Sequence, residues 1–143
     1  MKEIHIKNQQ ETENFGLALA GKLVPGSVVA LTGDLGAGKT TLTKAIAKGL
    51  GVQSMVTSPT FLIIQEYKDG RLPLYHFDLY RIDDEEEMDE LGYEEYFYGD
   101  GICVLEWADR IRSLLPENTL WIHIKYGKEE NERIYKIDKY TGN

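Results

Sequence analysis

The sequence has a single cysteine and no long apolar run, and each shortage excludes a class of protein. Cys103 cannot form an internal disulfide, so the chain is not a disulfide-stabilised secreted domain and fits the reducing cytoplasm. No apolar stretch approaches the roughly 18 residues that a membrane-spanning helix needs. Residues 1–5 lack the apolar core of a signal peptide. We therefore expect a cytoplasmic protein with no membrane partner.

Basic residues are also in deficit, since 24 Asp and Glu stand against 16 Lys and Arg, a formal charge of −8. Nine of the acids lie in the segment 83–95, which holds no Lys or Arg. A chain without a basic stripe is not expected to bind nucleic acid tightly by itself. The acidic segment is interpreted as a solvated helix, with a docking face for a basic partner surface as the alternative.

Apolar residues are patterned for both helices and strands. Residues 27–32 (SVVALT) and 102–106 (ICVLE) are continuous apolar runs, typical of strands buried on both faces. Helical spacing predicts helices over about 11–24, where Pro25 would stop the chain, and from 39 to about 50. The other expected elements are strands at 4–6, 60–67, 72–80, 120–126 and 133–137 and a helix at 108–115. This mixture predicts an α/β fold with a sheet that is at least partly parallel.

Residues 33–40 read GDLGAGKT and fit the phosphate-loop pattern G-x-x-x-x-G-K-[ST] at every fixed position. Glycines let backbone N–H groups turn inward around an anion, and the following helix points its positive end at the same place. Lys39 is expected to reach the β- and γ-phosphates, Thr40 to bind Mg²⁺, and Thr41 to donate to the α-phosphate. The nucleotide-binding residues predicted in this loop are Gly33, Asp34, Leu35, Gly36, Ala37, Gly38, Lys39, Thr40 and Thr41.

The phosphate loop stands between an expected buried strand and an expected helix, and this order indicates one particular fold class. We expect one domain over residues 1–143, a P-loop NTPase-like three-layer fold with a mixed, partly parallel central sheet.

A phosphate loop needs a carboxylate near Mg²⁺, usually at the end of a neighbouring buried strand. Glu106 ends the ICVLE strand and stands where an Asp is usual, so it is the candidate metal ligand together with Thr40. Asp78, in the segment HFDLYR, is the candidate for a carboxylate that either supports the metal site without binding the metal or acts as a base that orients water. Residues 57–61, Thr57 to Phe61 (TSPTF), could present a hydroxyl to the γ-phosphate or to Mg²⁺, as switch segments do. An ordinary strand end, hairpin and loop remain the plain alternatives.

Other chemistry has little support in the sequence. His5 and His123 alternate with apolar residues, and no cluster of Cys and His at metal-ligand spacing includes His76. Ser58 and Cys103 lack the context of a covalent nucleophile.

Four motifs together resemble a known family: GDLGAGKTT (33–41), SPTF (58–61), HFDLYR (76–81) and EW (106–107). In this order, in a chain of this length, they are similar to the TsaE family, small bacterial P-loop ATPases of tRNA A37 threonylcarbamoyladenosine modification. The resemblance implies binding of ATP or ADP with Mg²⁺ and slow ATP hydrolysis. It also implies activation in a complex with a TsaD-type threonylcarbamoyl transferase and a TsaB-type partner. Contact with tRNA would then be indirect, through that complex.

The resemblance also assigns roles residue by residue. Catalytic roles fall on Lys39, Thr60, Asp78 and Glu106, and the metal ligands are Thr40 and Glu106. Ser58, Pro59, Thr60 and Phe61 resemble the family's switch, and Trp107 its aromatic neighbour of the metal-binding acid. Gln9, Thr12 and Arg133 correspond to segments that border the family's nucleotide pocket, although this sequence matches the family poorly there.

Two other functions remain open at this point. A small-molecule kinase would carry an arginine-rich lid, but the chain has five arginines and only Arg110 and Arg112 are near neighbours in sequence. The third hypothesis is a nucleotide-dependent interaction module. It overlaps the hypothesis of a partner-activated ATPase, because a slow ATPase that reorganises its partners is a switch. With no evident arginine finger, we expect weak hydrolysis by the isolated protein.

Overall fold

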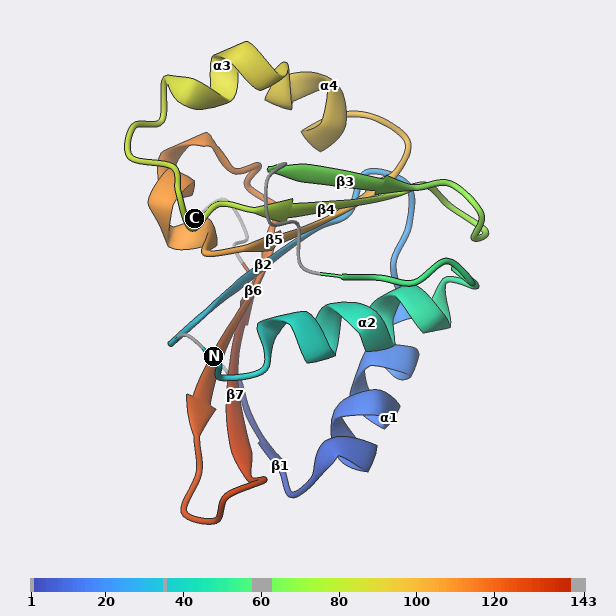
Figure 1. Cartoon of the computed structure of the whole chain (residues 1–143), viewed down its shortest axis with the longest axis vertical. Helices are drawn as coiled ribbons and strands as arrows, with labels where there is room; N and C mark the ends of the chain where they lie inside the picture. Colours follow the sequence, from blue (N-terminus) through green and yellow to red (C-terminus); the bar gives the residue numbers. More distant parts are fainter. Residues whose placement is uncertain (1, 35, 58–62, 140–143) are drawn as a thin grey trace.

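A computed structural model of the chain describes residues 2–34, 36–57 and 63–139. Seven strands form one sheet in the order β1-β7-β6-β2-β5-β4-β3, with helices on both faces (Figure 1). The elements in chain order are β1 Lys2–Ile6, α1 Gln9–Ala20, β2 Val28–Gly33, α2 Lys39–Gly49, β3 Ile64–Tyr67, β4 Leu74–Asp78, α3 Glu87–Leu91, α4 Tyr93–Phe97, β5 Ile102–Glu106, the 3-10 helix η1 Ala108–Leu114, β6 Leu120–Tyr126 and β7 Arg133–Lys139.

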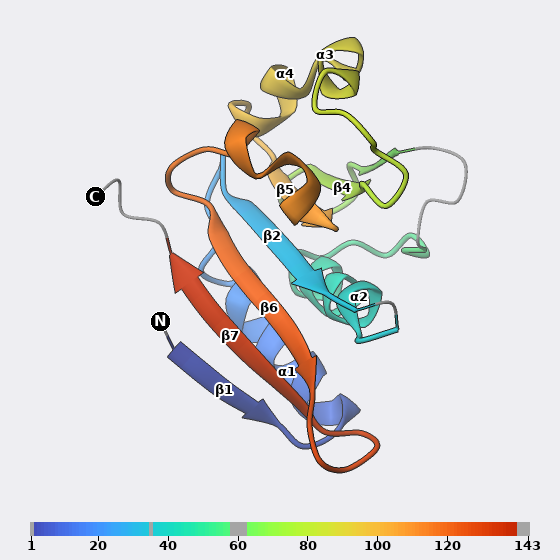
Figure 2. The ribbon, with the colours of Figure 1, turned by 90° about the vertical axis from the view of Figure 1, so that its left-hand side faces the viewer.

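The centre of the sheet is parallel. β2 pairs in parallel with β5 on one side and with β6 on the other, and β4 extends this group by pairing in parallel with β5. The outer pair β3–β4 is antiparallel, and so are β6–β7 and β1–β7 at the other side of the sheet (Figure 2). The expected three-layer α/β fold with a mixed, partly parallel sheet is therefore confirmed.

Each face of the sheet has its own apolar core. The face toward α1 and α2 buries Leu31, Val104 and Ile122 with Leu42 and Ile46 of α2. The opposite face carries Ala30, Phe77 and Leu105 against α3, α4 and η1, whose buried side chains include Met88, Phe97 and Ile111. Because successive strand residues point to opposite faces, a strand covered on both sides must be apolar throughout. This is why the runs SVVALT and ICVLE became the two central strands.

Helices α1 and α2 pack closely because small residues face each other. A Cβ atom on Gly16 would overlap the Cβ of Ala45 and lie 3.0 Å from the carbonyl carbon of the same residue. A Cβ atom on Gly49 would lie 2.5 Å from the Cβ of Ala20. The pair of helices therefore holds the phosphate-loop helix in place through contacts that admit no larger side chain.

Replacing Gly16 by Ala is expected to lower the free energy of unfolding by about 1–2 kcal/mol. Overpacking costs up to roughly 3 kcal/mol, whereas the gain in helix propensity is roughly 1 kcal/mol. Urea denaturation measures the change. Gly21→Ala is the matched control, since its nearest neighbour would be the Ala18 carbonyl oxygen at 3.5 Å. Equal stability of the two variants would contradict the close packing.

Several expected boundaries were wrong. The first helix begins at Gln9, where the Asn8 side chain accepts from the Glu11 N–H (3.0 Å), and it ends at Ala20. Pro25 therefore does not end it. The strand expected at 72–80 covers only Leu74–Asp78, and the helix expected at 108–115 is a 3-10 helix with a kink at Ile111. Of the strand expected at 60–67, residues 64–67 are extended and residues 60–62 lie outside the described part.

Residues 83–86 of the acidic segment precede α3, and residues 87–95 lie in the short helices α3 and α4, which are separated by Gly92 in a left-handed conformation (φ 67°). Among its acids, Glu87 accepts hydrogen bonds from the backbone N–H groups of Asp83 and Asp84, and Glu85 accepts one from the Ser113 hydroxyl of η1. Met88 packs into the core while most of the acids are exposed. The expected helix is therefore confirmed only in part, because residues 83–86 are not helical and Gly92 divides the remainder into two helices.

No helix within the described residues is both long enough and apolar enough to cross a membrane.

Candidate nucleotide-binding site

The phosphate loop connects β2 to α2 at the carboxyl end of the parallel strands, where ligands bind in folds of this kind. Gly33 has a φ of 143°, and a Cβ there would lie 2.6 Å from the Ile124 carbonyl oxygen of β6. Gly38, the N-cap of α2, has a φ of 114°. Only glycine adopts these conformations without strain. Gly33 is therefore required by its close contact with β6, and Gly38 by the backbone conformation at the start of α2.

Lys39 lies at the first position of α2 and is 4% exposed. Its Nζ donates to the carbonyl oxygens of Gly33 (2.7 Å) and Asp34 (2.9 Å). Burial lowers the pKa of Lys39 below its usual value, while Glu106 and Asp34 act in the opposite direction. The ammonium group is therefore held inside the loop, facing the point at which backbone N–H groups and the helix end favour an anion.

Trp107 covers this lysine. The Lys39 Nζ lies 4.2 Å from the centroid of its ring, within the range of a cation–π contact. Trp107 has a φ of 60°, the only positive φ of a non-glycine residue in the described chain. A left-handed conformation at a bulky residue is strained and is found mainly at functional sites. The strain turns the chain directly after Glu106 and brings the indole over the loop.

Thr40 and Glu106 meet as the motif predicts. The Thr40 hydroxyl donates to the Glu106 carboxylate, with both oxygens at 3.0 Å. Among the described residues, no group of three or more His, Cys, Asp and Glu could hold a metal. A hydroxyl beside one carboxylate suits Mg²⁺, which prefers oxygen ligands and takes few from the protein, the rest coming from phosphates and water. The donor set therefore fits magnesium.

A pocket of about 260 Å³ lies over these groups. Asp78 lines it and is paired in register with Glu106 on the neighbouring strand. Its Oδ1 accepts from the Tyr80 backbone N–H at 3.1 Å. The pocket is lined by Gly36, Gly38, Lys39, Thr40, Thr41, Asp78, Tyr80, Glu106 and Trp107. The structure thus brings together the phosphate loop and both carboxylates proposed from the sequence.

The loosely assigned residues Gln9, Thr12 and Arg133 also lie beside the loop. They line a smaller pocket of about 50 Å³ with Ala37, Gly38, Thr41, Asn131 and Tyr135. The Arg133 Nε donates to the Ala37 carbonyl at 2.8 Å, and its Nη1 donates to the carbonyls of Glu130 and Glu132. Arg133 therefore fastens the β6–β7 hairpin to the phosphate loop.

Five predicted site residues, Leu35, Ser58, Pro59, Thr60 and Phe61, lie outside the described residues. Cys103 is fully buried, and burial raises the pKa of its thiol to about 12, which is unfavourable for a nucleophile.

Sequence reasoning missed His76, Tyr80, Asn131 and Tyr135. His76 is fully buried, and its Nε2 lies 2.6 Å from the Glu106 Oε2. The available signal was alternation, because residues 76 and 78 of one strand share a face. For Asn131 and Tyr135 no local pattern existed, since they reach the pocket only through the fold of the hairpin.

Known proteins resemble this chain in sequence and in fold. The family model described as threonylcarbamoyl adenosine biosynthesis protein TsaE matches residues 6–135. The chain is 50% identical over 127 residues to the tRNA threonylcarbamoyladenosine biosynthesis protein TsaE of Bacillus subtilis, covering 89% of this chain and 79% of that protein. It is 43% identical over 128 residues to the protein of the same name from Treponema pallidum, covering 90% and 94%.

A solved structure is similar throughout. The crystal structure of Bacillus subtilis YdiB superposes with a TM-score of 0.84 at 42% sequence identity, covering 97% of this chain and 85% of that one. Since the family model spans most of the chain and relatives share this much sequence, the chain belongs to the TsaE family.

Proposed function

We propose that this protein binds ATP with Mg²⁺ and hydrolyses it slowly, and that it serves tRNA A37 threonylcarbamoyladenosine synthesis with TsaD-type and TsaB-type proteins. One observation supports the ATPase function. The Thr40 hydroxyl lies 3.0 Å from the carboxylate oxygens of Glu106, beside the phosphate loop in which Lys39 is buried. The printed names of the relatives from Bacillus subtilis and Treponema pallidum support the pathway.

Each residue has a defined task in this proposal. Lys39 and the backbone N–H groups of the loop bind the phosphates and offset their charge. Thr40 and Glu106 would hold Mg²⁺, which supplies charge neutralisation at the β- and γ-phosphate oxygens when bound. Asp78, on the pocket wall beside Glu106, accepts a hydrogen bond from the attacking water and orients it.

The nucleoside part of ATP is assigned to the smaller pocket. Gly38 and Thr41 line both this pocket and the larger one, so a nucleotide can extend across the start of α2 from one to the other. Gln9 and Asn131 have amide groups of the kind that recognise a base edge. Arg133 keeps the hairpin against the loop and thereby preserves the shape of this pocket.

Arg71, Arg110 and Arg133 contact other groups of the chain, in keeping with the weak activity expected of the isolated protein. Stabilising the transferred phosphoryl group commonly takes an arginine finger, worth several orders of magnitude in rate. Arg133 donates to three backbone carbonyls, and Arg71 donates to the carbonyls of Ala20 and Leu23. Arg110 lies over the Tyr80 ring at 5.5 Å. We propose that a partner completes the site.

The test is ATPase activity measured with and without the TsaB-type and TsaD-type proteins of the same organism. The expected result is a stimulation of at least about 10-fold by the two partners together, within the range that a group supplied in trans contributes. Lys39→Ala mixed with the same partners controls for contaminating ATPase. Absence of stimulation, or fast hydrolysis by the purified protein alone, would contradict partner activation, and transfer of phosphate to a metabolite would favour a kinase.

A further inference from the structure

His76 is fully buried on the sheet face beneath α2, and it contacts a proposed metal ligand. It lies in β4, one strand away from Glu106, and its Nε2 is 2.6 Å from the Glu106 Oε2. Both side chains are almost completely removed from solvent, at 0% and 5% exposure. Burial of polar groups is unfavourable unless they are hydrogen-bonded. The presence of a polar pair at this depth therefore requires a physical explanation.

The surroundings of His76 do not demand a histidine. Alternation along β4 places it on the same face as Leu74, and its register neighbour Val104 belongs to the same apolar core. Its Nδ1 has no hydrogen-bond partner among the described residues. A side chain retained only for packing would be served as well by leucine, which leaves no buried nitrogen unpaired. The polar contact to Glu106 is therefore what distinguishes histidine at this position.

That contact fixes the orientation of the carboxylate. Glu106 accepts from the Thr40 hydroxyl on one side and from His76 on the other. Because a carboxylate can only accept, Nε2 must be the donor. With Oε2 tied to β4, the carboxylate cannot rotate freely about its last bond and stays turned toward Thr40. Hydrogen-bonding partners of this kind orient metal ligands and raise metal affinity.

We propose that His76 is a positioning residue: its Nε2–H bond holds the Glu106 carboxylate toward Thr40 and thereby sets the Mg²⁺ affinity of the nucleotide site. This inference rests on the proposed Mg²⁺–ATP function. It predicts that His76 matters for the metal and not for the nucleotide itself, because the ring contacts the carboxylate and does not line the pocket over the phosphate loop.

The test compares three replacements of His76. His76→Leu removes the donor, and His76→Asn carries its amide nitrogen near the position of Nδ1, too far back to reach Glu106. His76→Gln carries its amide nitrogen near the position of Nε2 and can restore the bond. His123→Leu is the matched control, because His123 of β6 is bonded to the Thr32 hydroxyl (2.7 Å) and not to Glu106.

The readout is fluorescence of an N-methylanthraniloyl ATP analogue, titrated first with protein in EDTA and then with Mg²⁺ at fixed protein. In EDTA all variants are expected to bind the analogue within about twofold of the unmodified protein. His76→Leu and His76→Asn are expected to need at least about 10-fold more Mg²⁺ for the half-maximal effect. His76→Gln and His123→Leu are expected to stay within about threefold.

Other outcomes are equally decisive. An unchanged Mg²⁺ midpoint in His76→Leu, or in His76→Asn should the leucine variant fail to fold, would overturn the positioning role. Equal losses in EDTA and in Mg²⁺, shared by His76→Gln and accompanied by a lower melting temperature, would show a structural role and overturn it too. If the unmodified protein binds the analogue with no dependence on Mg²⁺, the proposed function itself fails.

Discussion

Replacing Lys39 by Ala is expected to weaken nucleotide binding at least about 100-fold. The ammonium group is the cation at the centre of the phosphate loop, 4% exposed and already held by the carbonyls of Gly33 and Asp34. Charge-assisted hydrogen bonds of this kind are worth about 1.5–3 kcal/mol each, and Lys39 is placed to make more than one to phosphate. Titration of the fluorescent ATP analogue in EDTA measures the loss without any contribution from metal.

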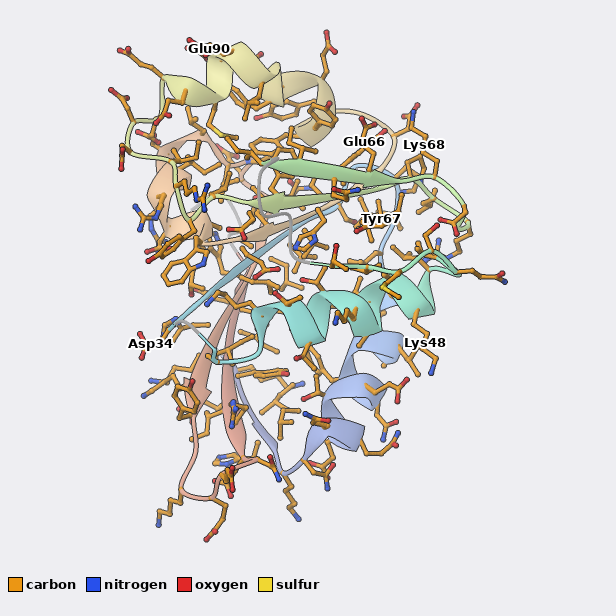
Figure 3. The ribbon with its side chains drawn as sticks, in the orientation of Figure 1. Asp34, Lys48, Glu66, Tyr67, Lys68 and Glu90 are labelled. Carbon is orange, nitrogen blue, oxygen red and sulfur yellow. The ribbon has the colours of Figure 1, made fainter. Side chains whose placement is uncertain are left out.

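Lys48→Ala is the matched control for this experiment. Lys48 lies in the last turn of the same helix and pairs with Glu13, at the opposite end of α2 from the phosphate loop (Figure 3). Its removal takes one positive charge from the chain, as the Lys39 substitution does, and it should leave nucleotide affinity within about twofold because the pair is exposed and screened. Comparable losses in the two variants would mean that total charge, and not the loop, governs binding.

Replacing Glu106 by Gln is expected to keep nucleotide affinity in EDTA within about threefold and to reduce Mg²⁺-dependent hydrolysis at least about 100-fold. The amide oxygen can still accept from Thr40 and from His76, so the packing around residue 106 is retained. The negative charge that would bind the metal is lost, and metal-assisted phosphoryl transfer depends on several kcal/mol of charge stabilisation. Hydrolysis is measured with the partner proteins present, where we expect the highest rate.

Glu66→Gln controls for the loss of one carboxylate. Glu66 lies on the edge strand β3 and is exposed beside Lys68 (Figure 3), and β4 and β5 separate this strand from β2, the strand that leads into the phosphate loop. The Glu66→Gln variant should hydrolyse ATP at the rate of the unmodified protein. Were Glu106→Gln to hydrolyse ATP normally, Asp78 would become the candidate metal ligand, since it stands in register with Glu106 on the wall of the same pocket.

Local patterns account for most of what could be predicted of the fold. The runs SVVALT and ICVLE became β2 and β5 because a strand covered on both faces has no position for a polar side chain before its end. The phosphate loop was predictable for a similar reason, because φ angles of 143° at Gly33 and 114° at Gly38 can be met without strain only by glycine. In both cases the constraint acts on the residue itself.

Element ends were predicted poorly where tertiary contacts decide them. The first helix was expected to run to Pro25, yet it ends at Ala20. Leu23 is buried against the core from a non-helical segment, and the Ala20 and Leu23 carbonyls are satisfied by Arg71, far along the chain. Apolar spacing shows that a residue is buried, but it does not show by which conformation the chain brings it there.

The sequence by itself determined the class of fold, the phosphate loop and the two carboxylates at strand ends, because each depends on residues adjacent in the chain. Only the tertiary structure decided that Glu106 faces Thr40, that His76 stands behind Glu106 and that Arg133 binds the Ala37 carbonyl. Those contacts depend on strand order and register, and alternation specifies the face of a residue but not its neighbour. Nine of the acids behind the charge of −8 lie in α3, in α4 and in residues 83–86 just before α3. The two helices cover the face of the sheet opposite α1 and α2, where the fold keeps this charge away from the helix that carries the loop (Figure 1).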